Sequence, residues 1–128
     1  MLINSQNYRT VWMQDNFVYL INQQLLPHKF EIYQSKNHLE TANAIKTMIV
    51  RGAPAIGATG GFGIAQAALE FKGKNFVDFK KHIENAEKTL KSTRPTANDL
   101  FYAIDFVKEK ILKRRILLDQ NKEVLKIK

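Results

Sequence analysis

The stretch from Met48 to Gly57, MIVRGAPAIG, is the most informative part of the sequence for the fold. Small and apolar residues continue from it to Phe71. Proline suits the first turn of a helix, because the N–H that it lacks is one the helix leaves unpaired. Pro54 therefore predicts a helix that runs to Phe71. Gly52 has no Cβ, so a ligand or another backbone can come close. Free N–H groups at this helix start, with Arg51 beside them, suit a phosphate or a carboxylate.

A second arginine precedes a proline in residues 92–101, STRPTANDLF. This pattern predicts another helix that opens at Pro95, with Thr93 as its cap. Two helix starts that carry Arg51 and Arg94 can converge on one anion. The alternative stays equally open: each arginine pairs with an acidic side chain or with the C-terminal end of a helix.

Glycines are concentrated inside the helix predicted from Pro54, at Gly57, Gly60, Gly61 and Gly63. Each costs about 1 kcal/mol relative to alanine in a helix interior, so packing must hold this segment in place. The lack of bulk lets a neighbouring helix or a ligand approach closely. A nucleotide-binding loop is excluded, because no Gly-Lys-Ser/Thr follows and the third glycine of the dinucleotide motif is missing.

Alternation of apolar and polar residues predicts three short strands, at Thr10–Gln14, Asn16–Asn22 and Phe30–Tyr33. Asp15-Asn16 can supply the turn between the first two. Three consecutive strands of this kind form a small antiparallel sheet.

Apolar residues at spacings of three and four predict the helices. The first begins at Asn37 or His38 and ends at the Arg51-Gly52 turn, and another runs from Phe76 or Asp78 to Lys91. The Pro95 helix carries an apolar stripe, which residues 119–121 either interrupt or kink. The expected fold class is α+β and mostly α, with a small three-stranded antiparallel sheet in residues 1–35 and a helical bundle in residues 36–128 of one domain.

Composition excludes several classes of protein. The chain has 128 residues, 45% of them apolar and 25% charged, as expected for one soluble globular domain. It has no cysteine, which excludes a disulfide framework, a thiol nucleophile and a cysteine metal site. His28, His38 and His82 show no metal-ligand spacing. We expect them at surface or capping positions, and no metal or cofactor is predicted.

Net charge is +8, of which +5 falls between Lys108 and Lys128, where eight basic residues accompany three acidic ones. A solvated helical face explains this tail better than nucleic-acid binding, because aromatic residues are not interleaved with it.

The chain start does not resemble a secretory signal, and no apolar run approaches the roughly 20 residues that span a bilayer. The cytoplasm is the expected location, without membrane contact.

Residues 50–57, VRGAPAIG, followed by Arg94–Ala97, RPTA, resemble the N-terminal part of methylthioribose-1-phosphate isomerases. These enzymes belong to the superfamily shared with ribose-1,5-bisphosphate isomerase and the regulatory subunits of translation initiation factor 2B. Leu20–Pro27 is similar to the leucine-rich "IDQ…LP" segment of the family. The likeness extends from about Tyr8 to about Val107, most of the chain.

The resemblance implies an aldose–ketose isomerisation of 5-methylthioribose 1-phosphate to 5-methylthioribulose 1-phosphate, a reaction of methionine salvage. In the family, a cysteine and an aspartate on a C-terminal Rossmann-like domain supply the acid and base that such a reaction needs. Carried over by position, Arg51, Gly52, Ala53 and Arg94 would bind the substrate, chiefly its phosphate. No catalytic residue is assigned. The chain then has the binding half of an active site and lacks the C-terminal catalytic domain, as a fragment, one piece of a split protein or a repurposed relative.

Two positions depart from the family pattern. Asn22 stands where the family commonly has aspartate, and Asn98-Asp99 stands in place of an apolar residue and asparagine. A carboxylate at Asp99 suits the start of a helix but would oppose a phosphate if it pointed at the anion. A solvated or arginine-paired Asp99 is the interpretation we favour.

Two other functions remain as alternatives. A regulatory or interaction domain like those of initiation factor 2B, without catalysis, follows from the shared superfamily and the basic tail. A non-specific nucleic-acid binder follows from charge alone and is least favoured. The expected partners are a sugar phosphate and a C-terminal domain or separate chain with the missing catalytic pair, and a homo-oligomer is left open.

Overall fold

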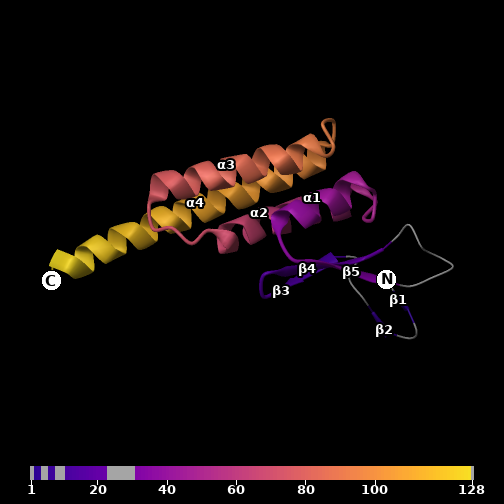
Figure 1. The fold of residues 1–128 in the computed structure, drawn as a ribbon, viewed down its shortest axis with the longest axis horizontal. Helices are drawn as coiled ribbons and strands as arrows, with labels where there is room; N and C mark the ends of the chain where they lie inside the picture. Colours follow the sequence, from indigo (N-terminus) through magenta and orange to yellow (C-terminus); the bar gives the residue numbers. More distant parts are fainter. Residues whose placement is uncertain (1, 4–5, 8–10, 23–30, 128) are drawn as a thin grey trace.

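The computed structural model describes the backbone of residues 2–3, 6–7, 11–22 and 31–127, and the side chains of residues 11–22 and 31–116. Its elements are β1 (Leu2–Ile3), β2 (Gln6–Asn7), β3 (Val11–Gln14), β4 (Phe17–Ile21), β5 (Ile32–Ser35), α1 (His38–Lys46), α2 (Ala53–Glu70), α3 (Phe76–Ser92) and α4 (Asn98–Ile127). The expected class, α+β and mostly α, is confirmed (Figure 1). The β1–β2 pair is an addition that the sequence did not predict.

Strands β3, β4 and β5 form an antiparallel sheet in sequence order, as predicted. Asp15 and Asn16 make the turn between β3 and β4, and Asp15 has φ 58°, a conformation that aspartate tolerates in tight hairpins. One face of β4 buries Val18 and Leu20 in the core. Thr10 and Phe30, expected at strand starts, lie outside the described residues, as do His28 and residues 23–27 of the LINQQLLP segment.

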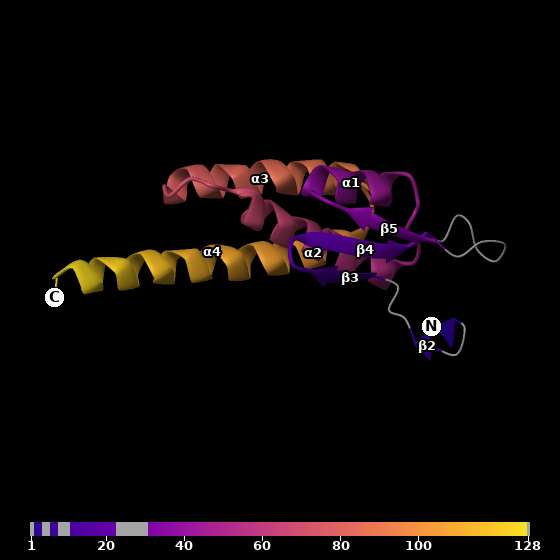
Figure 2. The same ribbon diagram turned by 60° about the horizontal axis from the view of Figure 1, so that its bottom comes forward.

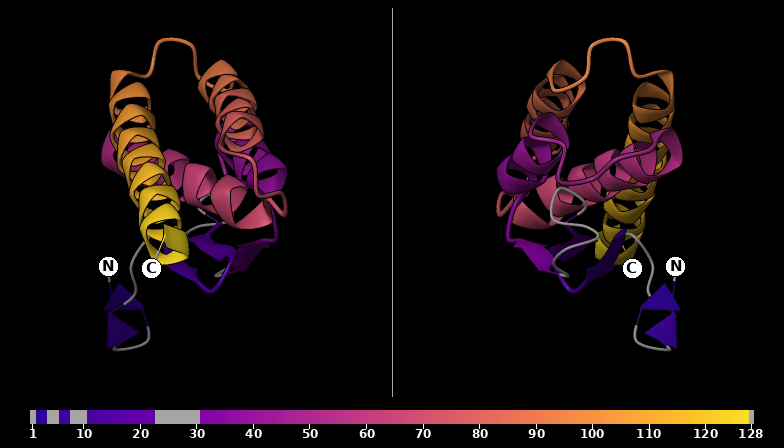
Figure 3. Two further views of the ribbon diagram at one scale, coloured as in Figure 1. Left: turned by 90° about the vertical axis from the view of Figure 1, so that its left-hand side faces the viewer. Right: turned by 90° about the vertical axis from the view of Figure 1, so that its right-hand side faces the viewer.

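Helix α2 lies at the centre of the bundle and contacts α1, α3, α4 and the strands β3 and β4 (Figures 1 and 3). Its glycines make this possible. A Cβ at Gly60 would lie 2.3 Å from Cδ1 of Leu100 in α4, and a Cβ at Gly63 would lie 3.0 Å from both methyl groups of Leu90 in α3. The small residues of α2 therefore let neighbouring helices pack closely against it. The sequence predicted that either a helix or a ligand would approach these glycines.

The prediction that α1 extends to Arg51 was wrong. The helix ends at Lys46, and the amides of Met48 and Ile49 turn back to donate to the carbonyls of Ile45 and Ala44. This is a Schellman ending, with Met48 in the left-handed region at φ 65°. Ile49 is buried after the turn, so the apolar spacing continued past the end of the helix and misled the prediction.

Helix α3 matches its predicted range to within one residue, and its buried face carries Phe79, Ile83, Ala86 and Leu90. Helix α4 continues through residues 119–121 to Ile127 without interruption. Its far end extends beyond the other helices (Figure 2). No helix in the described part of the chain is long and apolar enough to cross a membrane.

An ion-pair network joins α3 to α4. The carboxylate of Glu87 accepts hydrogen bonds from Lys91 and Lys108, each at 2.8 Å, and Lys91 also reaches Asp105 at 2.7 Å. Burial alone would raise the pKa of Glu87, but the hydrogen bonds from the two lysines outweigh burial and hold that pKa below its ordinary value. Burial would likewise lower the pKa of Lys91, and its two acidic partners raise it instead. Two of these ion pairs, Lys91–Asp105 and Lys108–Glu87, connect the two helices.

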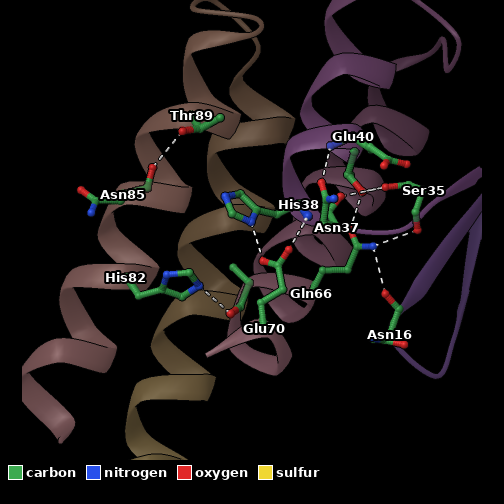
Figure 4. A network of polar contacts seen from close by, with 12 residues as sticks. Asn16, Ser35, Asn37, His38, Glu40, Gln66, Glu70, His82, Asn85 and Thr89 are labelled. Atoms are coloured by element: carbon green, nitrogen blue, oxygen red, sulfur yellow. Dashed lines mark hydrogen bonds and ion pairs between the residues drawn. The ribbon is translucent and has the colours of Figure 1, made fainter. Parts of the chain in front are cut away.

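A buried polar network fastens the sheet to the helices (Figure 4). The side-chain amide of Gln66 in α2 donates to the carbonyls of Asn16 and Ser35, both at 3.1 Å, and its oxygen accepts from the hydroxyl of Thr41 in α1. The hydroxyls of Thr41 and Ser35 lie 2.6 Å apart. Gln66 is fully buried, and both its amide nitrogen and its amide oxygen have hydrogen-bond partners.

Of the two described histidines, His82 caps a helix end, one of the two positions expected, whereas His38 pairs with a carboxylate. His38 opens α1, where its backbone N–H donates to Glu70 at 3.1 Å and its Nδ1 lies 2.5 Å from the same carboxylate. His82 of α3 uses Nε2 to bind the carbonyl of Ala67 in the last turn of α2, at 2.9 Å (Figure 4). Both side chains therefore tie the C-terminal end of α2 to its neighbours.

Candidate anion-binding site

Helix α2 begins at an exposed N-terminus. Gly52 precedes the helix with φ 92°, a conformation in the region that favours glycine, and a Cβ there would meet nothing within 4 Å. The first helical hydrogen bond runs from the amide of Ile56 to the carbonyl of Gly52, at 2.9 Å. The amides of Ala53 and Ala55 precede that bond, and the first turn contains no acidic residue. This end of the helix is positive and suits an anion.

The second arginine lies in a turn, and the prediction that Pro95 opens a helix was wrong. Residues 94–97 form a β-turn in which the amide of Ala97 donates to the carbonyl of Arg94 at 3.1 Å. Pro95 takes the second position of that turn, which its fixed φ also favours. Thr93 ends α3 by donating its N–H and its hydroxyl to the carbonyl of Leu90, so it caps the helix before it. Helix α4 begins only at Asn98.

A cleft of about 360 Å³ lies where these two helix starts meet. Ala53 and Ile56 line it from α2, and the turn and the start of α4 contribute Arg94, Thr96, Ala97, Asn98, Asp99 and Leu100. Of the four expected binding residues, the structure thus brings Ala53 and Arg94 together. Gly52 and the exposed Arg51 immediately precede Ala53 along the chain but are not among the lining residues.

The charges around the cleft are mixed. The guanidinium of Arg94, partly exposed, and the N-terminal ends of α2 and α4 favour an anion. The exposed Asp99 occupies the first turn of α4 and lines the same cleft, where its carboxylate opposes a phosphate.

Sequence reasoning missed that Ile56, Thr96 and Asn98 line the cleft. Thr96 and Asn98 fall within the motif of residues 92–101, but no sequence pattern placed Ile56 beside that motif. Their convergence on α2 depends on the close packing of Gly57 against α4, where a Cβ would lie 3.0 Å from the carbonyl oxygen of Asp99. That contact positions the first turn of α4 beside the first turn of α2.

Comparison with known proteins places these features in context. The model of the initiation factor 2 subunit family matches residues 49–127. The putative methylthioribose-1-phosphate isomerase of Pyrococcus horikoshii is 48% identical over 101 residues, which cover 79% of this chain and 28% of that protein. Methylthioribose-1-phosphate isomerase 1 of Pseudothermotoga lettingae is 41% identical in an alignment of 130 positions that covers 94% of this chain and 37% of that protein.

Solved structures show the same fold. The crystal structure of 5-methylthioribose 1-phosphate isomerase from P. horikoshii matches with a TM-score of 0.78 at 45% identity, covering 84% of this chain and 30% of that one. The delta subunit of translation initiation factor eIF-2B from A. fulgidus matches with a TM-score of 0.74 at 34% identity, covering 92% and 38%. The chain therefore spans about a third of the length of the proteins it matches.

Proposed function

The chain belongs to the initiation factor 2 subunit family, with isomerases of methylthioribose 1-phosphate among its relatives, and we propose that it supplies the sugar-phosphate-binding part of such an isomerase. The observation that carries the proposal is the cleft between the start of α2 and the turn before α4, lined by Ala53 and Arg94. Both residues fall within the RGAP and RPTA motifs. The enzyme would convert 5-methylthioribose 1-phosphate to its ketose, in methionine salvage.

The proposed binding mode follows from the geometry of the cleft. Arg94 and the amides at the start of α2 hold the phosphate, and Gly52 presents the first of those amides through its positive φ. Arg51 approaches the phosphate from the outer side of the same helix start. Asp99 accepts hydrogen bonds from ring hydroxyls of the sugar, which removes the conflict between its charge and the phosphate.

The proton transfers of the reaction need an acid and a base, and no residue of the cleft is assigned to either role. We propose that the part of the isomerase that this chain does not span supplies both and closes the cleft against water. An initiation factor 2B-like regulatory domain without catalysis is not favoured, because the matching isomerases share more identity with this chain than the eIF-2B subunit does.

Titration with 5-methylthioribose 1-phosphate, followed by calorimetry, tests the binding role. Replacing Arg94 by alanine removes a charge-assisted hydrogen bond of about 1.5–3 kcal/mol, so we expect the Kd to rise about tenfold or more. Arg114→Ala, in the exposed distal part of α4, removes the same charge far from the cleft along the helix and serves as the matched control. Equal affinity of the Arg94→Ala and Arg114→Ala variants would refute the proposal.

The role of Arg51 is tested separately. Arg51→Ala should weaken binding of the same sugar phosphate, and an unchanged Kd would remove Arg51 from the proposed site while leaving Arg94 in it. Phosphorus NMR of the wild-type chain with the sugar phosphate, followed over hours, tests whether this chain alone catalyses the isomerisation. We expect no ketose phosphate, and its appearance would show that an acid–base pair lies within these 128 residues.

A further inference from the structure

The carboxylate of Asp99 is a second charge in the candidate cleft, and the binding mode above uses it only for hydroxyl groups. Arg94 and Asp99 are the two charged residues among those that line the cleft. Their charges are opposite, yet no ion pair joins them. Within the part of the chain that the structure describes, neither side chain has a hydrogen-bond or ion-pair partner. Both charges are therefore available to a ligand.

Packing fixes the position of Asp99. A Cβ at Gly57 would lie 3.0 Å from its carbonyl oxygen, so α2 is in close contact with the first turn of α4. The next residue, Leu100, is fully buried in the core. Because the backbone is held in this way, α4 cannot carry the carboxylate away from a ligand without breaking those contacts.

The charges of the cleft match a ligand with one anionic group. A phosphate monoester carries about 1.5–2 negative charges at neutral pH. Arg94 and the N–H groups at the start of α2 offset that charge, and the proposed binding mode assigns Arg51 to the same phosphate. Among the described residues that line the cleft there is no second cation for another phosphate, and Asp99 repels one.

We propose that Asp99 is a specificity-determining residue, which excludes sugars with a second anionic group and restricts the cleft to monophosphates. The inference rests on the proposed function, which supplies the phosphate that Arg94 holds. The repulsion acts on the substituent at C5 of the sugar. A methylthio group at C5 is neutral, whereas a phosphate at C5 brings a second negative group into a cleft that already contains a carboxylate. Repulsion of the wrong ligand separates compounds that share all their attractive contacts.

Three sugars that differ only at C5 test the proposal: 5-methylthioribose 1-phosphate, ribose 1-phosphate and ribose 1,5-bisphosphate. Calorimetry measures the Kd of each for the wild type and for Asp99→Asn, which keeps the size of the side chain and removes its charge. We expect the wild type to bind the bisphosphate about tenfold more weakly than either monophosphate. In Asp99→Asn, the ratio of the bisphosphate Kd to the monophosphate Kd should fall about fivefold or more.

Two further variants separate the charge of Asp99 from its other effects. Asp99→Glu keeps the charge, so we expect it to retain most of the wild-type selectivity. Asp78→Asn is the matched control, because it removes an exposed carboxylate from the first turn of α3, at the end of that helix remote from the cleft. It should leave the ratio unchanged.

Salt supplies a readout that a purely steric role of Asp99 would not change. Salt screens exposed charges, so the selectivity of the wild type should fall toward that of Asp99→Asn as ionic strength rises. A ratio that is independent of salt in the wild type would contradict the proposal.

The outcomes distinguish the two proposals. Equal selectivity of the wild type and Asp99→Asn, with both binding the monophosphates, overturns the role of Asp99 and leaves the sugar-phosphate site standing. Tighter binding of the bisphosphate than of the monophosphates by the wild type also overturns it. Failure of the wild type to bind any of the three sugars refutes the proposed function, and the specificity role falls with it.

Discussion

Replacing Gly60 by alanine tests whether α4 can pack against α2 only because this position lacks a Cβ. A Cβ at Gly60 would lie 2.3 Å from Cδ1 of Leu100 and 3.2 Å from Cγ1 of Ile104, and both of these side chains are fully buried. Carbon atoms pack at about 3.5–4 Å, so Leu100 must move by more than about 1 Å within a filled core.

The net effect is the difference between two opposing contributions. Alanine is more favourable than glycine in a helix interior by about 1 kcal/mol. Overpacking of a filled core costs about 1–3 kcal/mol, and the fully buried neighbours of Gly60 favour the upper part of that range. We therefore expect Gly60→Ala to destabilise the fold by about 1–2 kcal/mol, which lowers the Tm by roughly 5 °C for a chain of this length.

Gly61→Ala is the matched control, one residue along the same helix. Its Cβ would lie 3.1 Å from a methyl group of Val107, which borders an open groove between α2 and α4 and can move into it. This variant gains the same helix propensity at a smaller packing cost, so we expect a Tm equal to or slightly above that of the wild type. Thermal unfolding followed by circular dichroism measures both. An equal rise in Tm for the two variants would refute the packing role of Gly60.

Three further predictions concern stability. Gln66→Leu removes the donor to the buried carbonyl of Ser35 and to the partly buried carbonyl of Asn16, so urea unfolding should show a loss of about 2–3 kcal/mol, and a loss below the error of extrapolation would contradict the network. Met48→Gly relieves the left-handed conformation and should stabilise the chain by about 0.5 kcal/mol in the same assay, whereas Met48→Ala, which keeps the Cβ, should bring no such gain. The lowered pKa of Glu87 stabilises the fold above its ordinary value of 4.5, and that contribution is lost as pH falls below 4.5 through the folded-state pKa. The stability difference between wild type and Glu87→Gln should therefore shrink on acidification, and a constant difference would contradict the assigned ion pairs.

Much of the fold could be predicted because local pattern and tertiary environment agree. The alternation in β3 and β4 matches a sheet with one buried face, and the apolar stripe of α3 matches a helix with one buried face. The errors fall where two local rules compete. Pro95 suits both a first helical turn and the second position of a β-turn, and the second use prevailed. Ile49 kept the helical spacing although the chain had already turned at Met48.

The candidate site was predictable as a set of motifs but not as a geometry. The cleft brings Arg94 and Ala53 together, although Arg94 lies in a β-turn and not at a helix start. The direction in which Arg51 leaves the helix depends on the φ of 92° at Gly52, which sequence identifies as permissive without giving its value. The place of Asp99 in the cleft depends on α4 starting three residues later than Pro95 suggested.

Helix α4 begins at the cleft and continues for 30 residues as one rod. At 1.5 Å per residue it is about 45 Å long, so a tilt of about 5° at its first turn displaces its far end by about 4 Å. Its first turn is also the part that Gly57 holds against α2 and that Asp99 contributes to the cleft. Because α4 is one continuous helix, a small rotation of its first turn is enlarged along its length and is greatest at Ile127.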